Sequence, residues 1–233
     1  MNEGEVVHAL NKVGAIIFDS HVVYTSGKHG STYINKDAVY PHTAETSRLC
    51  HALAERFAGD NIQVVIAPAI GGVILSQWLA YHLTEMNGRE VLGVYAEKEG
   101  TELVSSSYGP LPPKYENAFV IKRGYDKLIA GKNVLVVEDI LNTGGSARKV
   151  IDAASSVGGN IVGLGVLCNR GGITARDLSV LKLVSLIDAR SPDVWDEGSC
   201  PLCERDVPIN TDVGKGREFL ARQRKRCKSA DPY

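Results

Sequence analysis

One segment of the chain combines two carboxylates with a glycine-rich loop, in the order strand, acids, loop and helix. It reads VLVVEDILNTGGSA and spans residues 134–147. Glu138 and Asp139 end an apolar run that is typical of a buried strand, and their carboxylates could accept hydrogen bonds from sugar hydroxyls. Backbone N–H groups of the loop 142–146 would converge on an anion at the N-terminus of the following helix. The segment therefore predicts a site for a phosphorylated ribose.

The loop is neither of the two common nucleotide-binding loops. No Gly-Lys-Ser/Thr follows its glycines, as a Walker loop requires, and the GxGxxG fingerprint is absent. An acidic pair, two apolar residues and then T-G-G-S resemble the PRPP (5-phosphoribosyl 1-diphosphate) signature of type I phosphoribosyltransferases. Taken alone, the same residues could form an ordinary strand-turn-helix connection with two solvated acids.

Four further segments narrow the resemblance to the orotate phosphoribosyltransferases, over residues 15–210. SGKHGSTYIN (26–35) resembles the N-terminal segment of that family, and IAPAIGGVILS (66–76) resembles its pyrophosphate-holding loop. LCNR (167–170) ends a strand where the family has an arginine that faces orotate. CPLCERDVPI (200–209) resembles a C-terminal segment of many bacterial members.

The resemblance implies a role for particular residues. The catalytic set would be Lys98, Asp139 and Glu138, the two acids contacting the ribose hydroxyls. The 5′-phosphate would lie against Asn142, Thr143, Gly144, Gly145, Ser146 and Ala147. Pyrophosphate would be held by Ala69, Ile70, Gly71, Gly72 and Lys98. The base would contact Arg170, Tyr33, Ile34, Asn142 and Thr25.

The implied reaction converts orotate and PRPP to orotidine 5′-monophosphate and pyrophosphate, as in pyrimidine synthesis. Catalysis would depend on electrostatics and positioning, because the family passes through a transition state with oxocarbenium character. The resemblance implies Mg²⁺ held mainly by PRPP, without a dedicated protein ligand set. It also implies a homodimer with shared active sites. We expect a cytoplasmic enzyme with neither a nucleic-acid nor a membrane partner.

Two departures from the family pattern keep other functions open. Asn142 stands where many members have threonine near the base, so a different nucleobase is an alternative substrate. Glu97-Lys98-Glu99 replaces the arginine-lysine-glutamate run of the family, and a long Ser/Pro-rich loop replaces its lysine-x-histidine-glycine element. An active enzyme would then need another group, such as His29 or Lys114, to neutralise pyrophosphate. A non-catalytic PRPP-sensing regulator is the third reading.

The elements that must position these residues alternate between strands and helices. Short apolar runs predict strands at 64–67, 91–95, 133–138, 161–168 and 183–187, and apolar spacing predicts helices at 73–86 and 146–157. Such alternation indicates an α/β fold with a mainly parallel central sheet and helices on both faces. The resemblance makes this the type I phosphoribosyltransferase fold, with a small N-terminal hood subdomain.

We expect three segments. Residues 1–42 would form an N-terminal helix (6–13) and the hood on the base-binding side. Residues 43–190 would form the PRPP-binding core, with a lid loop at about 97–118 and further basic residues, Lys122 and Arg123, in a strand beside it. Residues 191–233 would carry the CPLC turn and a basic tail.

Composition excludes several classes of protein. The 233 residues are 44% hydrophobic and 23% charged with a net charge of −1, which indicates a globular domain without a global basic field for nucleic acid. The chain has five cysteines, a small and odd number that argues against a disulfide framework and favours a reducing compartment. Cys200 and Cys203 have zinc-knuckle spacing, but only Cys227 is a nearby third ligand, so we expect a turn held by packing.

Overall fold

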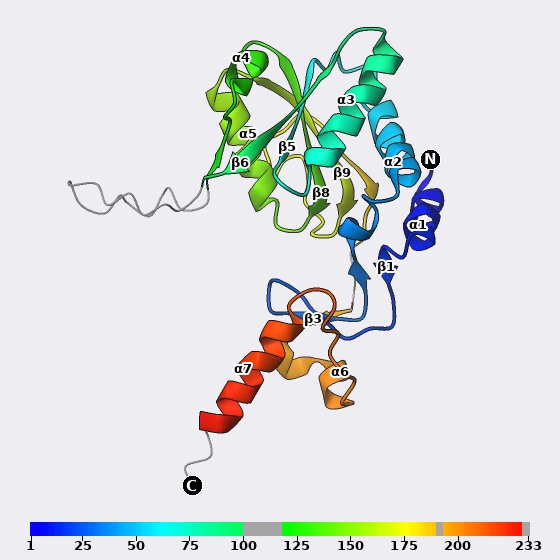
Figure 1. Cartoon of the computed structure of the whole chain (residues 1–233), viewed down its shortest axis with the longest axis vertical. Coiled ribbons are helices and arrows are strands. Elements are labelled where there is room, and N and C mark those ends of the chain that lie inside the picture. Colours follow the sequence, from blue (N-terminus) through cyan, green and yellow to red (C-terminus); the bar gives the residue numbers. More distant parts are fainter. Residues whose placement is uncertain (100–117, 190–192, 230–233) are drawn as a thin grey trace, which may run out of the picture. The chain divides into compact units, whose positions relative to one another are not determined.

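The structure is a computed structural model that describes residues 1–99, 118–189 and 193–229 (Figure 1). Most of the predicted lid, including Lys114, lies outside these residues. The chain divides into two compact units, and each is described by itself. The first contains Met1–Val6 and Tyr40–Arg190, and the second contains Val7–Val39 and Ser191–Tyr233.

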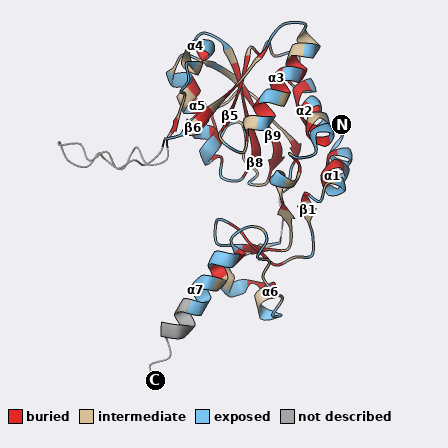
Figure 2. Cartoon of the chain, viewed as in Figure 1, coloured by how far each residue is buried: buried red, intermediate tan, exposed pale blue. Residues whose placement is uncertain are grey.

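A six-stranded sheet forms the centre of the first unit. Its strand order is β10-β9-β8-β5-β6-β7, and every neighbouring pair is parallel except β6 and β7. The strands are β5 (Val64–Pro68), β6 (Leu92–Lys98), β7 (Phe119–Val120), β8 (Asn133–Leu141), β9 (Asn160–Asn169) and β10 (Leu183–Ile187). The central strand β5 is apolar and buried, and β8 is almost completely buried although it contains the two acids, as expected for a sheet covered on both faces (Figure 2).

Helices cover both faces of this sheet (Figure 1). They are α2 (Thr43–Glu55), α3 (Val73–Asn87), α4 (Tyr125–Ile129) and α5 (Gly145–Ser156). Helices α2 and α3 pack against each other, and α5 packs on β8, β5 and β9. One cluster of the core joins the sheet to α5 through Val136, Leu164, Val150 and Ala154, all fully buried. The predicted fold class, a mainly parallel sheet with helices on both faces, is confirmed.

The structure changes several predicted elements. Helix α2 was not predicted from the sequence. Strand β8 runs three residues beyond the predicted end at residue 138, so the two acids lie inside the strand. Strand β7 ends at Val120, so Lys122 and Arg123 follow the strand and do not belong to it. Helix α5 begins at Gly145, one residue before the predicted start at residue 146.

The second unit is built from short elements of both chain ends. Strands β2 (Val22–Val23), β3 (His29–Gly30) and β11 (Val194–Trp195) form one antiparallel sheet. Its other elements are β1 (Ile16–Ile17), β4 (Tyr33–Ile34), the 3-10 helices η1 (Lys36–Ala38) and η3 (Glu197–Ser199), α6 (Pro201–Glu204) and α7 (Gly216–Ser229). Helix α1 (Glu3–Lys12) begins in the first unit and continues into the second. The hood and the three predicted segment boundaries stay predictions.

None of the helices in the described part of the chain combines the length and the hydropathy that a membrane span requires.

Candidate active site

Four chain segments with possible chemistry meet at one edge of the main sheet. Strands β5, β6, β8 and β9 are parallel, so their carboxyl ends lie at the same edge. The chain leaves β5 toward β6 on one side and later returns to β8 on the other side. This reversal is a topological switch point, where open α/β sheets bind their ligands. The predicted pyrophosphate and phosphate loops follow the two strands that flank it.

The acid pair lies near the carboxyl end of β8 and is largely buried. Glu138 is 7% and Asp139 is 5% exposed. The Asp139 N–H donates to Oε1 of Glu138 at 3.3 Å, and the Ile140 N–H donates to Oδ1 of Asp139 at 2.6 Å. These backbone hydrogen bonds to a carboxylate oxygen hold each acid in place. The pair can therefore present fixed acceptor oxygens to the hydroxyls of a sugar.

The phosphate loop turns sharply between β8 and α5. Gly144 has φ +75°, in the left-handed region that favours glycine. A pocket of about 120 Å³ lies over this turn. Its lining comprises Glu138, Ile140, Leu141, Asn142, Thr143, Gly144, Gly145, Ser146 and Ala147. The structure thus brings Glu138 and all six predicted phosphate residues to one hollow at the N-terminus of α5.

The glycine loop after β5 (residues 69–72) is closely packed against neighbouring residues. A Cβ on Gly72 would lie 2.7 Å from Cβ of Ala67, so only glycine fits there. The Tyr40 hydroxyl donates to the Gly71 carbonyl at 2.6 Å, a support that the sequence analysis missed. The peptide bond between Ala69 and Ile70 is cis, and the Ile70 side chain is 89% exposed. Four of the five predicted pyrophosphate residues therefore lie in a braced turn at the carboxyl edge, and the fifth, Lys98, belongs to β6.

Arg170 follows β9 and is tied to the phosphate loop. The N–H groups of Arg170 and Gly171 both donate to the Leu141 carbonyl at 2.9 Å. The side-chain amide of Asn169 bridges to both the N–H and the carbonyl of Ile173, which closes the loop behind them. A Cβ on Gly171 would lie only 1.6 Å from the Asn142 carbonyl oxygen. Any movement of this loop must therefore move the phosphate loop as well.

Lys98 is the last residue of β6, at the same edge, and its side chain is exposed. It lies between two acids in the sequence, yet Oε1 of Glu97 is bound by Nε of Arg123 at 2.6 Å. The hydrogen bond and the charge of Glu97 raise the pKa of Arg123. Arg123 is thus engaged in an ion pair with Glu97. Of the two basic candidates Arg123 and Lys98, Lys98 is therefore the one that lies at the strand end without this pairing to Glu97.

The remaining predicted base residues belong to the second unit. Thr25 lies in the exposed turn between β2 and β3, and Tyr33 and Ile34 form β4. His29, considered above as a group that could neutralise pyrophosphate, is fully buried in β3 beside Cys203. Its burial makes that role wrong, because the ring is enclosed by its own unit.

Comparisons with known proteins agree with this geometry. The phosphoribosyl transferase domain family matches residues 35–197. Orotate phosphoribosyltransferase of Desulforamulus reducens is 34% identical over 89% of this chain and 95% of that protein. The enzyme of the same name from Pelotomaculum thermopropionicum is 36% identical over the same shares. The crystal structure of orotate phosphoribosyltransferase from Aeropyrum pernix has a TM-score of 0.58 at 26% identity, covering 78% of this chain and 92% of that one.

Proposed function

The chain belongs to the phosphoribosyltransferase family, and from this premise we propose that it transfers the 5-phosphoribosyl group of PRPP to orotate. The products are orotidine 5′-monophosphate and pyrophosphate. One observation carries the proposal. The buried acid pair and its phosphate loop lie beside the braced glycine loop, across the switch point of the sheet. Relatives that share about a third of their residues with this chain, over nearly its whole length, bear the name of this enzyme.

In the reaction, a ring nitrogen of orotate loses its proton to solvent and forms a bond with C1 of the ribose, while the bond from C1 to the pyrophosphate oxygen breaks and its electron pair leaves with pyrophosphate. Positive charge develops on the ribose and negative charge on the leaving group. Glu138 and Asp139 hold the ribose hydroxyls and face the developing positive charge with fixed negative charge. The loop 142–147 anchors the 5′-phosphate through backbone N–H groups, so that the sugar is oriented without a covalent intermediate.

Pyrophosphate leaves from the side of the glycine loop. The backbone of residues 69–72 binds its oxygens, and the small Gly71 and Gly72 allow close approach. Lys98, at the end of the neighbouring strand β6, supplies positive charge to the leaving group. Neutralising this charge as the bond breaks lowers the barrier more than binding the intact substrate does.

The lining of the pocket fits Mg²⁺, because Glu138 offers carboxylate oxygens there and this ion prefers oxygen ligands. When bound, Mg²⁺ would be held mainly by PRPP oxygens. It would supply positive charge for the leaving pyrophosphate.

Arg170 recognises the base. Its guanidinium offers a planar fork of donors, which suits the carboxylate and carbonyl oxygens of orotate. The backbone tie between Arg170 and Leu141 sets the distance between base and phosphate sites. The expected contacts of Thr25, Tyr33 and Ile34 with the base stay predictions. The proposal includes a homodimer with shared sites, which sedimentation at micromolar concentration would test.

The experiment is orotate-dependent formation of orotidine 5′-monophosphate from PRPP and Mg²⁺. The unchanged chain should turn over. Asp139→Asn should lose about 10- to 100-fold in kcat/KM, as expected for a charge-assisted hydrogen bond of about 1.5–3 kcal/mol. Asp152→Asn, on the exposed side of α5, is the matched control and should retain full activity. Equal activity of both variants would refute the role of the acid pair.

A further inference from the structure

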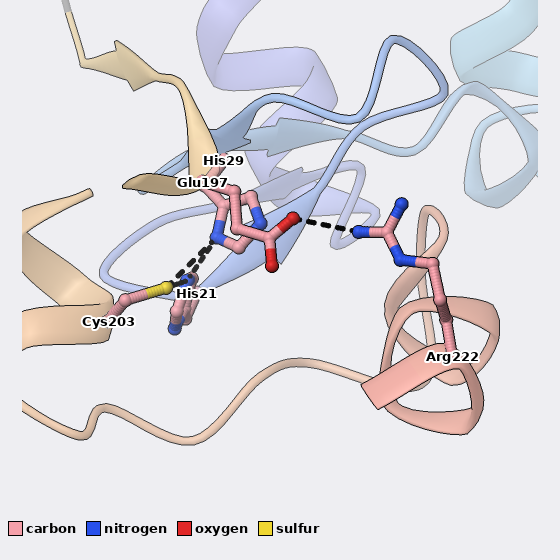
Figure 3. A network of polar contacts seen from close by, with 5 residues as sticks. All are labelled: His21, His29, Glu197, Cys203 and Arg222. Carbon is pink, nitrogen blue, oxygen red and sulfur yellow. Dashed lines mark hydrogen bonds and ion pairs between the residues drawn. The ribbon is translucent and has the colours of Figure 1, made fainter. Parts of the chain in front are cut away.

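Four metal-ligating side chains meet inside the second unit, and none of them has a role in the proposed reaction. His21, His29, Cys200 and Cys203 each offer one ligand atom, and these four atoms lie within 4.8 Å of one another. Figure 3 shows both imidazole rings turned toward the Cys203 sulfur. The exposed fractions are 2% for His21, 0% for His29 and 1% for Cys200. Such complete burial is rare for a histidine without a specific partner.

The fold of the unit explains how residues so distant in sequence converge. Strands β2 and β3 form a hairpin in which Val23 pairs with His29. His21 lies two residues before Val23, so the two histidines share one face of the hairpin as a diagonal pair. Strand β11 pairs with the other edge of β3 and leads through η3 to Cys200. Cys200 precedes α6 and Cys203 lies within it, so the segment that carries both cysteines faces the side of the hairpin that carries the two histidines.

The distances match a tetrahedral site. Nε2 of His21 lies 2.9 Å from Nδ1 of His29 and 3.6 Å from the sulfur of each cysteine. The Cys203 sulfur lies 3.3 Å from Nδ1 of His29. Zinc with Zn–S of about 2.3 Å and Zn–N of about 2.0 Å separates its ligand atoms by about 3.3–3.8 Å, and each contact agrees within about 0.5 Å. Four of the six separations between the ligand atoms therefore fit one tetrahedral ion, and all six are within 4.8 Å.

The tautomer of His21 also fits a ligand. Its Nδ1 lies 2.7 Å from the Val207 carbonyl oxygen, which can only accept, so Nδ1 carries the proton. In the neutral ring, Nε2 then holds a lone pair that faces the cluster. A backbone carbonyl on the far nitrogen is the usual orienting partner of a metal-bound histidine.

We propose that these residues form a structural Zn²⁺ site. Two thiolates balance the charge of the ion, and two thiolates with two imidazoles in tetrahedral array are a typical zinc ligand set. All four positions are taken by protein groups, so no position is open for water or substrate. The ion would fasten the N-terminal hairpin to the C-terminal segment, within a unit whose strands are each two residues long. This site is independent of the transferase reaction.

The test is the metal content of the full chain, produced without a polyhistidine tag and freed of loose ions by gel filtration. We expect one zinc per chain by mass spectrometry. Replacing zinc with Co²⁺ should give the visible bands and the thiolate-to-cobalt charge-transfer band of a tetrahedral site. Cys203→Ser should lose most of the zinc and the charge-transfer intensity. Cys168→Ser, a buried cysteine of strand β9, is the matched control and should retain both.

Two results would overturn the site: a chain without zinc that binds Co²⁺ with no thiolate band, or a Cys203→Ser variant that keeps its zinc. If the variants fail to fold, the cobalt spectrum of the unchanged chain decides. Chelation should also lower the melting temperature of the unchanged chain and leave that of Cys203→Ser unaltered. The outcome does not depend on activity, so the site and the proposed transferase reaction fail or stand separately.

Discussion

Gly171→Ala perturbs the candidate active site at the contact between two loops. The new methyl carbon would lie 1.6 Å from the Asn142 carbonyl oxygen and 2.6 Å from the Asn142 carbonyl carbon. Both are backbone atoms, so no side chain can turn away to make room. Reaching even 3.0 Å requires the two loops to separate by at least about 1.4 Å. The bonds from Arg170 and Gly171 to Leu141 oppose that separation.

The separation would move the base-side arginine away from the phosphate loop. A misplacement of about 1 Å can cost about 100-fold in rate, which equals about 2.7 kcal/mol of transition-state stabilisation. We therefore expect Gly171→Ala to lower kcat/KM for orotate by about 100-fold or more. Steady-state pyrophosphate release measures this value, and thermal unfolding of the same sample shows whether the core is intact.

Gly59→Ala is the control, because a Cβ there meets nothing within 4 Å. It should match the unchanged chain in activity and melting temperature. A Gly171→Ala enzyme within threefold of the unchanged chain would refute the coupling of the two loops.

Three further predictions follow from particular residues. Gly144→Ala and Gly131→Ala both place alanine at positive φ, which should cost about 1–2 kcal/mol in stability. Only Gly144→Ala should also weaken PRPP binding, and equal KM values for PRPP in the two variants would contradict this. Burial, followed by the nearby charge of His51, lowers the pKa of His82, so the free energy of unfolding should fall as the pH drops below about 6.5. Urea unfolding should show a flatter dependence of stability on pH for His82→Gln than for His8→Gln, and equal slopes would contradict this. Burial raises the pKa of Cys168 to about 11, so iodoacetamide at about pH 8 should label this thiol only after denaturation, as peptide mass spectrometry can show.

Much of the main sheet could be predicted from the sequence, because its strands are continuous apolar runs between turn residues. The prediction for β10 matched at both ends, and that for β5 stopped one residue short. The sequence places the end of this strand at Glu138 and leaves Asp139 beyond it, since a charged pair ordinarily marks a strand end. In the fold the β8–β9 ladder continues past them to Leu141 and Asn169, which keeps Glu138 and Asp139 rigid.

The parts that could not be predicted depend on long-range contacts. Tyr40 supports the glycine loop from thirty-one residues away, and nothing in its neighbourhood marks that role. The cysteine knuckle was read as a packed turn because its partners were sought nearby in sequence. His21 and His29 lie at the opposite end of the chain, and the pairing of β11 with β3 helps to bring them to Cys200 and Cys203.

The most direct test of the proposed function is product identification in parallel reactions with PRPP, Mg²⁺ and one base each. The bases are orotate, uracil, adenine, guanine, hypoxanthine and xanthine. We predict pyrophosphate release and a nucleotide of the mass of orotidine 5′-monophosphate with orotate alone. A nucleotide formed only with another base would contradict the assignment of orotate and direct attention to Asn142 and Arg170. Folded chain that binds PRPP but forms no nucleotide with any base would contradict transferase activity itself.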